Sequence, residues 1–151
     1  MTMDASNRYQ VSRTAHVNAP PARVYAIISD YHQGHPKILP PQFQNLVVEK
    51  GGRGAGTHIS FQMKAFGRTM SFRHEVFEPE PGRVLVEQDR DNDSKTTFTI
   101  DPIPGGSSVT ITSDLISRPG LAGKIEQFLS KRFLLGVYDE EIKKLDAIAR
   151  S

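Results

Sequence analysis

Residues 61–74 read FQMKAFGRTMSFRH, with large apolar side chains at alternate positions on both sides of Phe66-Gly67. Alternation of this kind is typical of a β-strand with one buried face. If Phe66-Gly67 is a two-residue hairpin turn, the facing pairs are Met63 with Met70, Phe61 with Phe72, and Ile59 with His74. All six side chains then share one face of the sheet. That face is either ordinary core or the wall of a cavity.

The same alternation recurs along most of the chain, in segments bounded by the turn sequences GGRG, PEPG, DND and IPGG. Short connections of this type favour antiparallel neighbours, and the alternation indicates one buried and one solvated face. The predicted strands are residues 8–17, 43–50, 56–65, 68–78, 83–90, 94–101 and 107–117.

Two regions follow helical spacing instead. Residues 18–30, NAPPARVYAIISD, predict a short helix that Asn18 could cap, and the proline-rich loop 31–40 predicts at most a broken helical turn. After Pro119-Gly120, apolar residues recur at helical intervals to the end of the chain. They are Leu121, Ile125, Phe128, Leu129, Leu135, Tyr138, Ile142, Leu145 and Ile148.

This long amphipathic helix needs a large apolar partner, and the face of a curved sheet supplies one. We therefore expect a single α+β domain over residues 1–151, without internal repeats or a linker. Its predicted architecture is a seven-stranded curved antiparallel sheet wrapped around the C-terminal helix, with one or two short helices after the first strand.

Loop lengths predict the register of the remaining strands. The expected pairs are His74–Glu87 across a loop at 79–82, Glu87–Phe98 across a turn at Asn92-Asp93, and Phe98–Ile111 and Ile100–Val109 across a loop at 103–106. This register points Val84 and Val86 away from the helix. A bulge within residues 79–84 would instead bury the two valines, so both alternatives stay open.

Composition limits the classes of function. The 151 residues carry 19 basic and 17 acidic side chains, a net charge of +2 with the two signs interspersed. A nucleic-acid-binding protein more often shows a basic stripe with interleaved aromatic residues, so we expect no nucleic-acid partner. The absence of cysteine excludes disulfides and thiolate chemistry. Without an apolar signal core or a membrane-spanning stretch, we expect a cytoplasmic protein with no stable membrane insertion.

The inward face of the predicted sheet combines adaptable apolar side chains with polar ones. Methionine and phenylalanine suit ligands of varied shape, whereas burying an unpaired acid or imidazole costs on the order of several kcal/mol. A cavity that holds water and a ligand tolerates such groups, so we interpret this face as a cavity wall. The predicted lining is Ile59, Phe61, Met63, Met70, Phe72, His74, Glu87, Phe98, Ile111, Ser113, Phe128 and Arg132.

Two of these residues lie on the helix and have alternative roles. Phe128 belongs to an apolar stripe of the kind that is usually core. Arg132 falls in the same stripe, and its charged end is expected to reach solvent, the alternative being a contact with an acidic group of a ligand. The proline-stiffened loop should border the cavity mouth with Tyr31, His35, Ile38 and Leu39.

His74 and Glu87 allow three interpretations. They could anchor a ligand carbonyl or hydroxyl, act as a general acid–base pair in which the carboxylate orients the imidazole, or form an ordinary salt link. No catalytic residue is assigned on this basis.

Metal and cofactor signatures are weak or absent in the sequence. Asp30, His32 and His35 lack the fixed scaffold and fourth ligand that a structural metal site usually has. The glycine-rich stretch 51–56 lacks the Lys-Ser/Thr of a phosphate-binding loop and precedes a strand. We therefore expect neither a metal nor a cofactor.

The stretch VNAPPARVYAIISDYHQGHPKILP (17–40) resembles the N-terminal signature of the START-like, helix-grip (SRPBCC) superfamily. The stretch PGLAGKIEQFLSKRFLLGVYDEEIKKLDAIA (119–149) is similar to the C-terminal helix of its polyketide cyclase/dehydrase and lipid-transport-like members. The resemblance implies the helix-grip fold, with a cavity that holds lipids, sterols, polyketides, quinones or aromatic hormones. It implies no catalytic residue. Many relatives place tryptophan after the first helix, where this chain has Tyr31-His32, so a more polar lid is implied.

These observations lead to three hypotheses. The first is a binding or transport protein for one small apolar molecule, acting as a monomer or homodimer. The second is a polyketide cyclase or dehydratase that uses His74 as a base. The third is a protein-interaction module whose cavity has collapsed.

Overall fold

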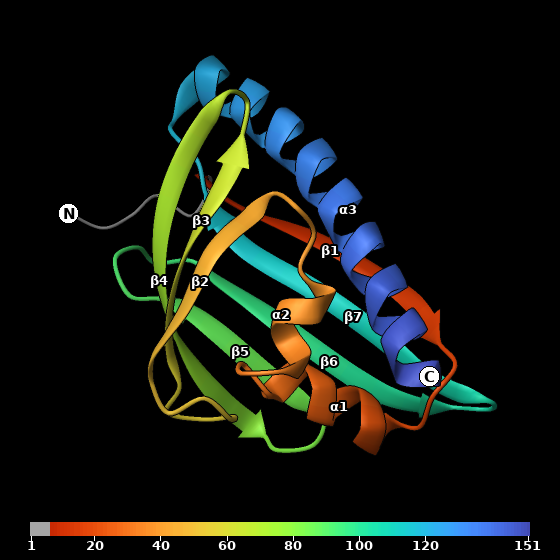
Figure 1. Cartoon of the computed structure of the whole chain (residues 1–151). Coiled ribbons are helices and arrows are strands. Elements are labelled where there is room, and N and C mark those ends of the chain that lie inside the picture. The colour runs from red at the N-terminus through yellow and green to blue at the C-terminus, as the bar shows by residue number, and fades with distance from the viewer. Residues whose placement is uncertain (1–6) are drawn as a thin grey trace.

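The structure is a computed structural model that describes residues 7–151, in which a curved sheet and a long helix enclose the interior (Figure 1). The elements in chain order are β1 (Arg8–Val17), α1 (Pro21–Ser29), α2 (Gly34–Ile38), β2 (Phe43–Lys50), β3 (His58–Ala65), β4 (Arg68–Glu80), β5 (Val84–Asp89), β6 (Lys95–Ile103), β7 (Gly106–Ile116) and α3 (Gly120–Arg150). All neighbouring strands are antiparallel, in the order β1-β7-β6-β5-β4-β3-β2. The predicted α+β helix-grip architecture is confirmed.

The β3–β4 hairpin has the predicted turn and register. Phe66 and Gly67 both adopt positive φ angles, 54° and 71°, as a two-residue type I′ turn requires. All three predicted pairs are present, and so are both pairs predicted between β6 and β7. In each case the register follows from a short connection, so nearby residues determine it.

The predicted pairing of His74 with Glu87 is wrong. His74 lies opposite Asp89, and Glu87 lies opposite Val76, because the turn between β4 and β5 lies at residues 81–83 and a bulge between Phe77 and Glu80 then moves the register back by one residue. The net shift amounts to two residues. Since side chains alternate between faces, Glu87 nevertheless stays on the concave face with His74.

The predicted pairing of Glu87 with Phe98 is also wrong, because the β5–β6 connection is longer than a two-residue turn. Glu87 lies opposite Thr96 instead. Val84 and Val86 remain half-buried on the outer face, so the bulge does not turn them into the core.

The start of α1 differs from the predicted cap. Pro20 occupies the N-cap position and no side chain caps the helix. Pro21 follows at the first helical position, where its fixed φ suits a helix start and its missing N–H leaves one donor fewer to satisfy. Asn18 instead binds the far end of the chain, donating from its backbone N–H to Asp146 Oδ1 of α3 at 2.8 Å.

Apart from Gly123, the buried residues of α3 lie in its C-terminal half. Figure 1 shows α3 crossing the sheet, with α1 and α2 beside its C-terminal end. The side chains buried there include Val137, Tyr138, Ile142 and Leu145. The first turns extend past this packed region, and the apolar residues exposed on them are Leu121, Ile125, Phe128 and Leu129. Within residues 7–151, no helix combines the length and apolar character needed to cross a bilayer.

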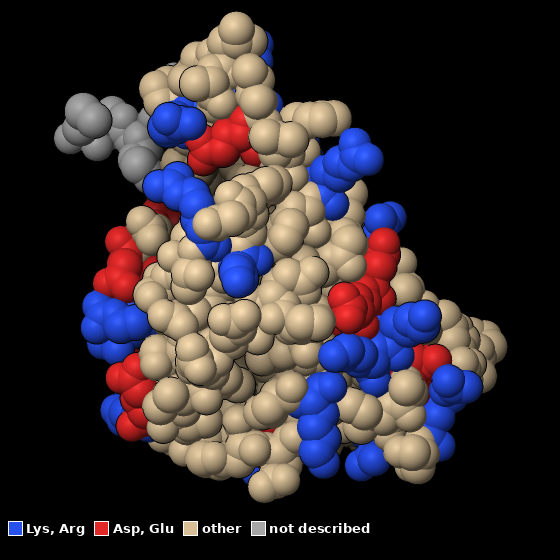
Figure 2. All heavy atoms as spheres, turned by 45° about the horizontal axis from the view of Figure 1, so that its top comes forward, with Lys and Arg blue, Asp and Glu red and all other residues tan. Residues whose placement is uncertain are grey.

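The protein surface carries both signs of charge around an extended uncharged area. With the hairpin end of the molecule tilted forward, Figure 2 shows a broad region of mostly uncharged side chains, bordered by lysine and arginine on several sides. Phe66 of the hairpin is 62% exposed, so this end of the molecule presents apolar side chains to solvent.

Candidate ligand-binding site

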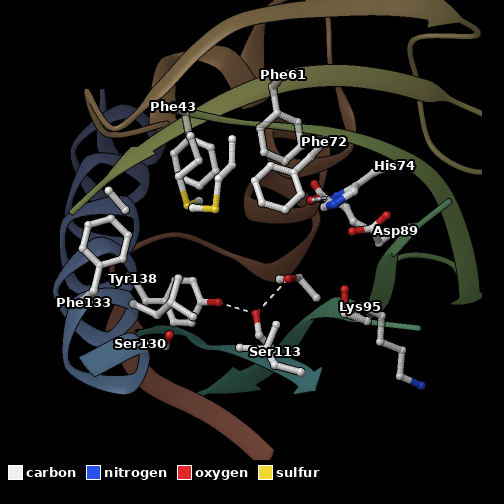
Figure 3. Close-up of a pocket in the computed structure, with 18 of the residues that line it drawn as sticks. Phe43, Phe61, Phe72, His74, Asp89, Lys95, Ser113, Ser130, Phe133 and Tyr138 are labelled. Carbon is white, nitrogen blue, oxygen red and sulfur yellow. Dashed lines mark hydrogen bonds and ion pairs between the residues drawn. The ribbon is translucent and has the colours of Figure 1, made fainter. Parts of the chain in front are cut away.

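A cavity of about 210 Å³ separates the concave face of the sheet from α3 (Figure 3). An apolar cavity of about 150 Å³ is large enough to admit benzene. The space is therefore sufficient for a small aromatic or branched aliphatic molecule, and side chains do not fill it.

Most of the strand residues predicted to form the cavity wall do line it. They are Phe61, Met63, Met70, Phe72, His74, Glu87, Phe98 and Ser113. Ile59 and Ile111 belong to the packed core instead. The two predicted helix residues, Phe128 and Arg132, do not line the cavity: both are exposed, whereas Ser130 between them lies on the face of α3 that borders it.

The predicted mouth residues lie at a closed end of the cavity. Tyr31 and Ile38 are buried in the core cluster, whereas His35 and Leu39 line the cavity. His35 is only 2% exposed, since α2 packs firmly over this end. The loop that contains α2 is therefore a wall of the cavity rather than a gate.

The cavity reaches the surface near the tip of the β3–β4 hairpin. Phe66 and Met70 line the cavity although both are exposed, Met70 by 41%. The Phe66 ring contacts Phe133 of α3, with centroids 5.4 Å apart. The hairpin and the helix thus form an apolar rim around an opening.

Aromatic rings form much of the cavity wall. Phe43, Phe61 and Phe72 follow one another on β2, β3 and β4, with centroid separations of 5.6 Å and 5.4 Å between successive rings. Figure 3 shows these rings on one side of the cavity and Phe133 and Tyr138 of α3 on another. Such a wall buries a ligand by apolar contact and imposes little directional preference.

Sequence reasoning missed the helix residues that do reach the cavity. The α3 residues that line it share a face of the helix other than the one that carries Phe128 and Arg132; they are Ser130, Phe133, Leu134, Tyr138 and Glu141. A signal was present, because residues at intervals of three and four share one face of a helix. Glu141 therefore lies on the same stripe as Tyr138, an unusual place for an acid.

The inner end of the cavity holds a polar cluster centred on Glu87. The Tyr31 hydroxyl donates a hydrogen bond to Glu87 Oε1 at 2.6 Å. His35 Nε2 lies 3.4 Å from the same oxygen, and His74 Nδ1 lies 3.5 Å from Oε2. All four side chains are buried.

The contacts of His35 show which of its ring nitrogens carries a hydrogen. Its Nδ1 lies 2.7 Å from the backbone carbonyl of Ile28. Since a carbonyl oxygen only accepts, Nδ1 must carry a proton. The other ring nitrogen, Nε2, faces Glu87 Oε1 at 3.4 Å, so the imidazole joins the end of α1 to the buried carboxylate.

The cluster has opposite effects on its two acidic groups. Burial acts to raise the pKa of Glu87, but the two imidazoles and the Tyr31 hydroxyl outweigh it and hold that pKa below its usual value. Burial, reinforced by the charge on Glu87, raises the pKa of the Tyr31 phenol well above its ordinary value. Glu87 is therefore an ionised acceptor and Tyr31 a neutral donor at neutral pH.

His74 is less completely bound than His35. The 3.5 Å separation from Glu87 is an ion-pair distance, too long for a good hydrogen bond. Its Nδ1 is buried and has no other hydrogen-bonding partner among residues 7–151. The imidazole lines the cavity edge-on to Phe61, with centroids 4.9 Å apart.

Three hydroxyl groups form a second polar cluster in the cavity. Thr96 and Ser113 share a hydrogen bond of 2.8 Å, and Ser113 bonds in turn to the Tyr138 hydroxyl. Figure 3 shows this chain running from the sheet to α3. It links the sheet to the helix across the cavity.

Comparisons with known proteins agree with this geometry. A family model described as polyketide cyclase/dehydrase and lipid transport matches residues 8–150. The chain belongs to this family. The resemblance to the START-like superfamily is thereby confirmed. No curated protein matches the sequence.

Solved structures share the fold over almost the whole chain. The NMR solution structure of the KanY protein has a TM-score of 0.86 and 27% identity, covering 95% of this chain and 99% of that one. The Zhui aromatase/cyclase from Streptomyces sp. R1128 has a TM-score of 0.73 at 14% identity, covering 95% and 94%. A START superfamily protein from Mycobacterium smegmatis has a TM-score of 0.71 at 17% identity, covering 93% and 97%.

Proposed function

We propose that this protein binds and transports one small hydrophobic molecule in the cavity between the sheet and α3. The observation that carries the proposal is the unfilled cavity, lined by phenylalanine and methionine and open at an apolar rim. Ligands compatible with this wall are lipids, polyketides, quinones and aromatic compounds. Binding draws on apolar area removed from water, about 25 cal/mol per Å² before the costs of ordering and association.

Native mass spectrometry of freshly purified protein tests the proposal directly, because a molecule that co-purifies reveals the ligand class. A quantitative test uses the uncharged fluorescent probe N-phenyl-1-naphthylamine with two variants. Met63→Trp fills the cavity from β3, whereas Lys64→Trp adds the same ring on the exposed face of the same strand.

The proposal predicts that Met63→Trp weakens probe binding at least tenfold and that Lys64→Trp leaves it unchanged. Equal binding by both variants would place the probe elsewhere and contradict the proposal. Urea unfolding of both variants separates lost binding from lost folding.

A second candidate function is a cyclase or dehydratase activity, favoured by one observation. His74 presents an imidazole inside the cavity with its Nδ1 3.5 Å from Glu87 Oε2, an arrangement in which the carboxylate orients the ring of a general base. His74→Ala distinguishes the two functions. The variant loses turnover of a poly-β-ketone substrate if the protein is an enzyme, and it keeps binding of the apolar probe if the protein is a carrier.

The third hypothesis, an interaction module with a collapsed cavity, loses its premise. The interior keeps a cavity of about 210 Å³. A binding function for that space accounts for more of the structure than a surface role does.

A further inference from the structure

Glu141 is the acid in the cavity that the polar cluster does not use. It projects from α3, lines the cavity and is 3% exposed. Glu87 has Tyr31 and two imidazoles around it. The Glu141 carboxyl takes part in none of the side-chain hydrogen bonds among residues 7–151, and it lines the cavity. An unsatisfied buried group destabilises the fold unless a ligand or water completes it.

A third acid on the cavity wall, Asp89, differs from Glu141 because its carboxylate is hydrogen-bonded. Asp89 accepts hydrogen bonds from the backbone N–H groups of Asp91 and Asn92, at 2.8 Å and 3.2 Å. These bonds hold the loop that follows β5. Asp89 is therefore a structural acceptor, and Glu141 alone among the three buried acids is left for a ligand.

The groups that face Glu141 determine its charge. Glu87 approaches it from β5, Tyr31 from the segment after α1, and Tyr138 from its own helix. Burial first and the charge on Glu87 second raise the pKa of Glu141 well above its usual value. Its carboxyl is therefore a neutral donor beside an ionised acceptor.

The surrounding charge also restricts the ligand. Among the lining residues, Lys95 is the one with a permanently cationic side chain, and Figure 3 shows its amine pointing out of the cavity. A ligand carboxylate at the inner end would meet Glu87 and Glu141 without a free cation. An ammonium group would compete with the Tyr31 hydroxyl and the two imidazoles that already surround Glu87. An uncharged oxygen avoids both difficulties.

We propose that the Glu141 carboxyl donates a hydrogen bond to a carbonyl or hydroxyl oxygen at the inner end of an uncharged aromatic ligand. This inference rests on the proposed binding function and adds the ligand's chemical class. The hydrophobic wall holds the ring system, while Glu141 recognises the oxygen and sets the orientation of the ligand.

Four naphthalene probes of nearly equal size test the inference: 2-acetylnaphthalene, 2-ethylnaphthalene, 2-naphthoate and 2-(aminomethyl)naphthalene. Their affinities are measured by titration calorimetry against the wild type, Glu141→Leu, Glu141→Gln and the control Glu140→Gln. Glu140 is the adjacent acid outside the cavity lining and keeps the helix composition matched.

The wild type should prefer the ketone over the ethyl compound by about threefold to tenfold, the worth of one hydrogen bond. Glu141→Leu should abolish this preference while it keeps or improves ethylnaphthalene binding. Glu141→Gln retains a neutral N–H donor and should keep the preference, as should Glu140→Gln.

The pH profile gives a second readout that does not depend on folding of the leucine variant. Ketone affinity of the wild type should fall as pH rises and Glu141 ionises, whereas Glu141→Gln should show a flat profile. A ketone preference that survives Glu141→Leu, a flat wild-type profile, or tighter binding of the amine or carboxylate at pH 7 would overturn the inference. If no probe binds, not even ethylnaphthalene, the proposed function fails and this inference with it.

Discussion

Replacing Glu141 by glutamine should remove a pH dependence from the stability of the fold. Burial of this carboxyl and the nearby charge of Glu87 raise its pKa above the 4.5 expected in the unfolded chain. The folded state therefore retains a proton that the unfolded chain releases. Stability from this group is fully present below the unfolded pKa and is lost as pH rises toward the folded pKa.

The magnitude follows from one proton per molecule. Where the unfolded chain has lost the proton and the folded state still holds it, the free energy of unfolding falls by about 1.4 kcal/mol per pH unit. Glutamine binds no proton and lacks this slope. The lowered pKa of Glu87 acts in the opposite direction, with stability lost as pH falls, but both proteins contain this group, so its effect largely cancels in the difference.

Urea unfolding followed by circular dichroism at pH 5, 6 and 7 measures the effect. The difference in the free energy of unfolding between Glu141→Gln and the wild type should shift in favour of the variant by up to about 1.4 kcal/mol per pH unit. Glu140→Gln is the matched control and should follow the wild type. If Glu141→Gln also runs parallel to the wild type across this range, Glu141 is not a buried neutral acid and the reasoning is refuted.

Three further predictions concern other parts of the molecule. Tyr31→Phe removes a donor from buried, ionised Glu87 and should cost about 1.5–3 kcal/mol of stability at pH 7 in urea unfolding, whereas a loss below about 0.5 kcal/mol would mean that water replaces the hydroxyl. Leu145→Ala should cost about 2–5 kcal/mol and Leu129→Ala less than about 0.5 kcal/mol, since the first is buried and the second is 44% exposed; equal losses in thermal unfolding would contradict the half-buried placement of α3. Gly67→Ala places a Cβ at φ +71° and should lower stability by about 1–2 kcal/mol, and an unchanged unfolding midpoint would argue against the type I′ turn.

Sequence information was sufficient where structure depends on neighbours along the chain. Two adjacent residues, Phe66 and Gly67, define the β3–β4 turn, and the alternating side chains then determine which of them face inward. The same reasoning held for the β6–β7 hairpin. It failed between β4 and β5, where the turn lies at residues 81–83 instead of 79–82 and the bulge that the sequence allowed as an alternative is present at 77–80.

The candidate site depended more strongly on tertiary contacts. Phe128 and Glu141 both lie on the long helix, yet Phe128 is 63% exposed and Glu141 is buried in the cavity wall. Helical periodicity shows which residues share a face, but not which face of the helix borders the cavity, and Ser130 lines it at the height of Phe128. Tyr31 and His35 follow the same rule, since only the docking of α2 places them against Glu87.

The sequence by itself determined the antiparallel sheet, the long amphipathic helix and the concave face on which phenylalanine, methionine and histidine gather, because alternation and helical periodicity are local properties. Only the tertiary structure decided that a space remains between sheet and helix, that His35 and Tyr31 surround Glu87, and that Glu141 faces the cavity without a hydrogen-bonding partner among residues 7–151. The burial of a side chain and its hydrogen-bonding partners depend on segments that are far apart in the sequence. These segments come into contact only when the chain folds.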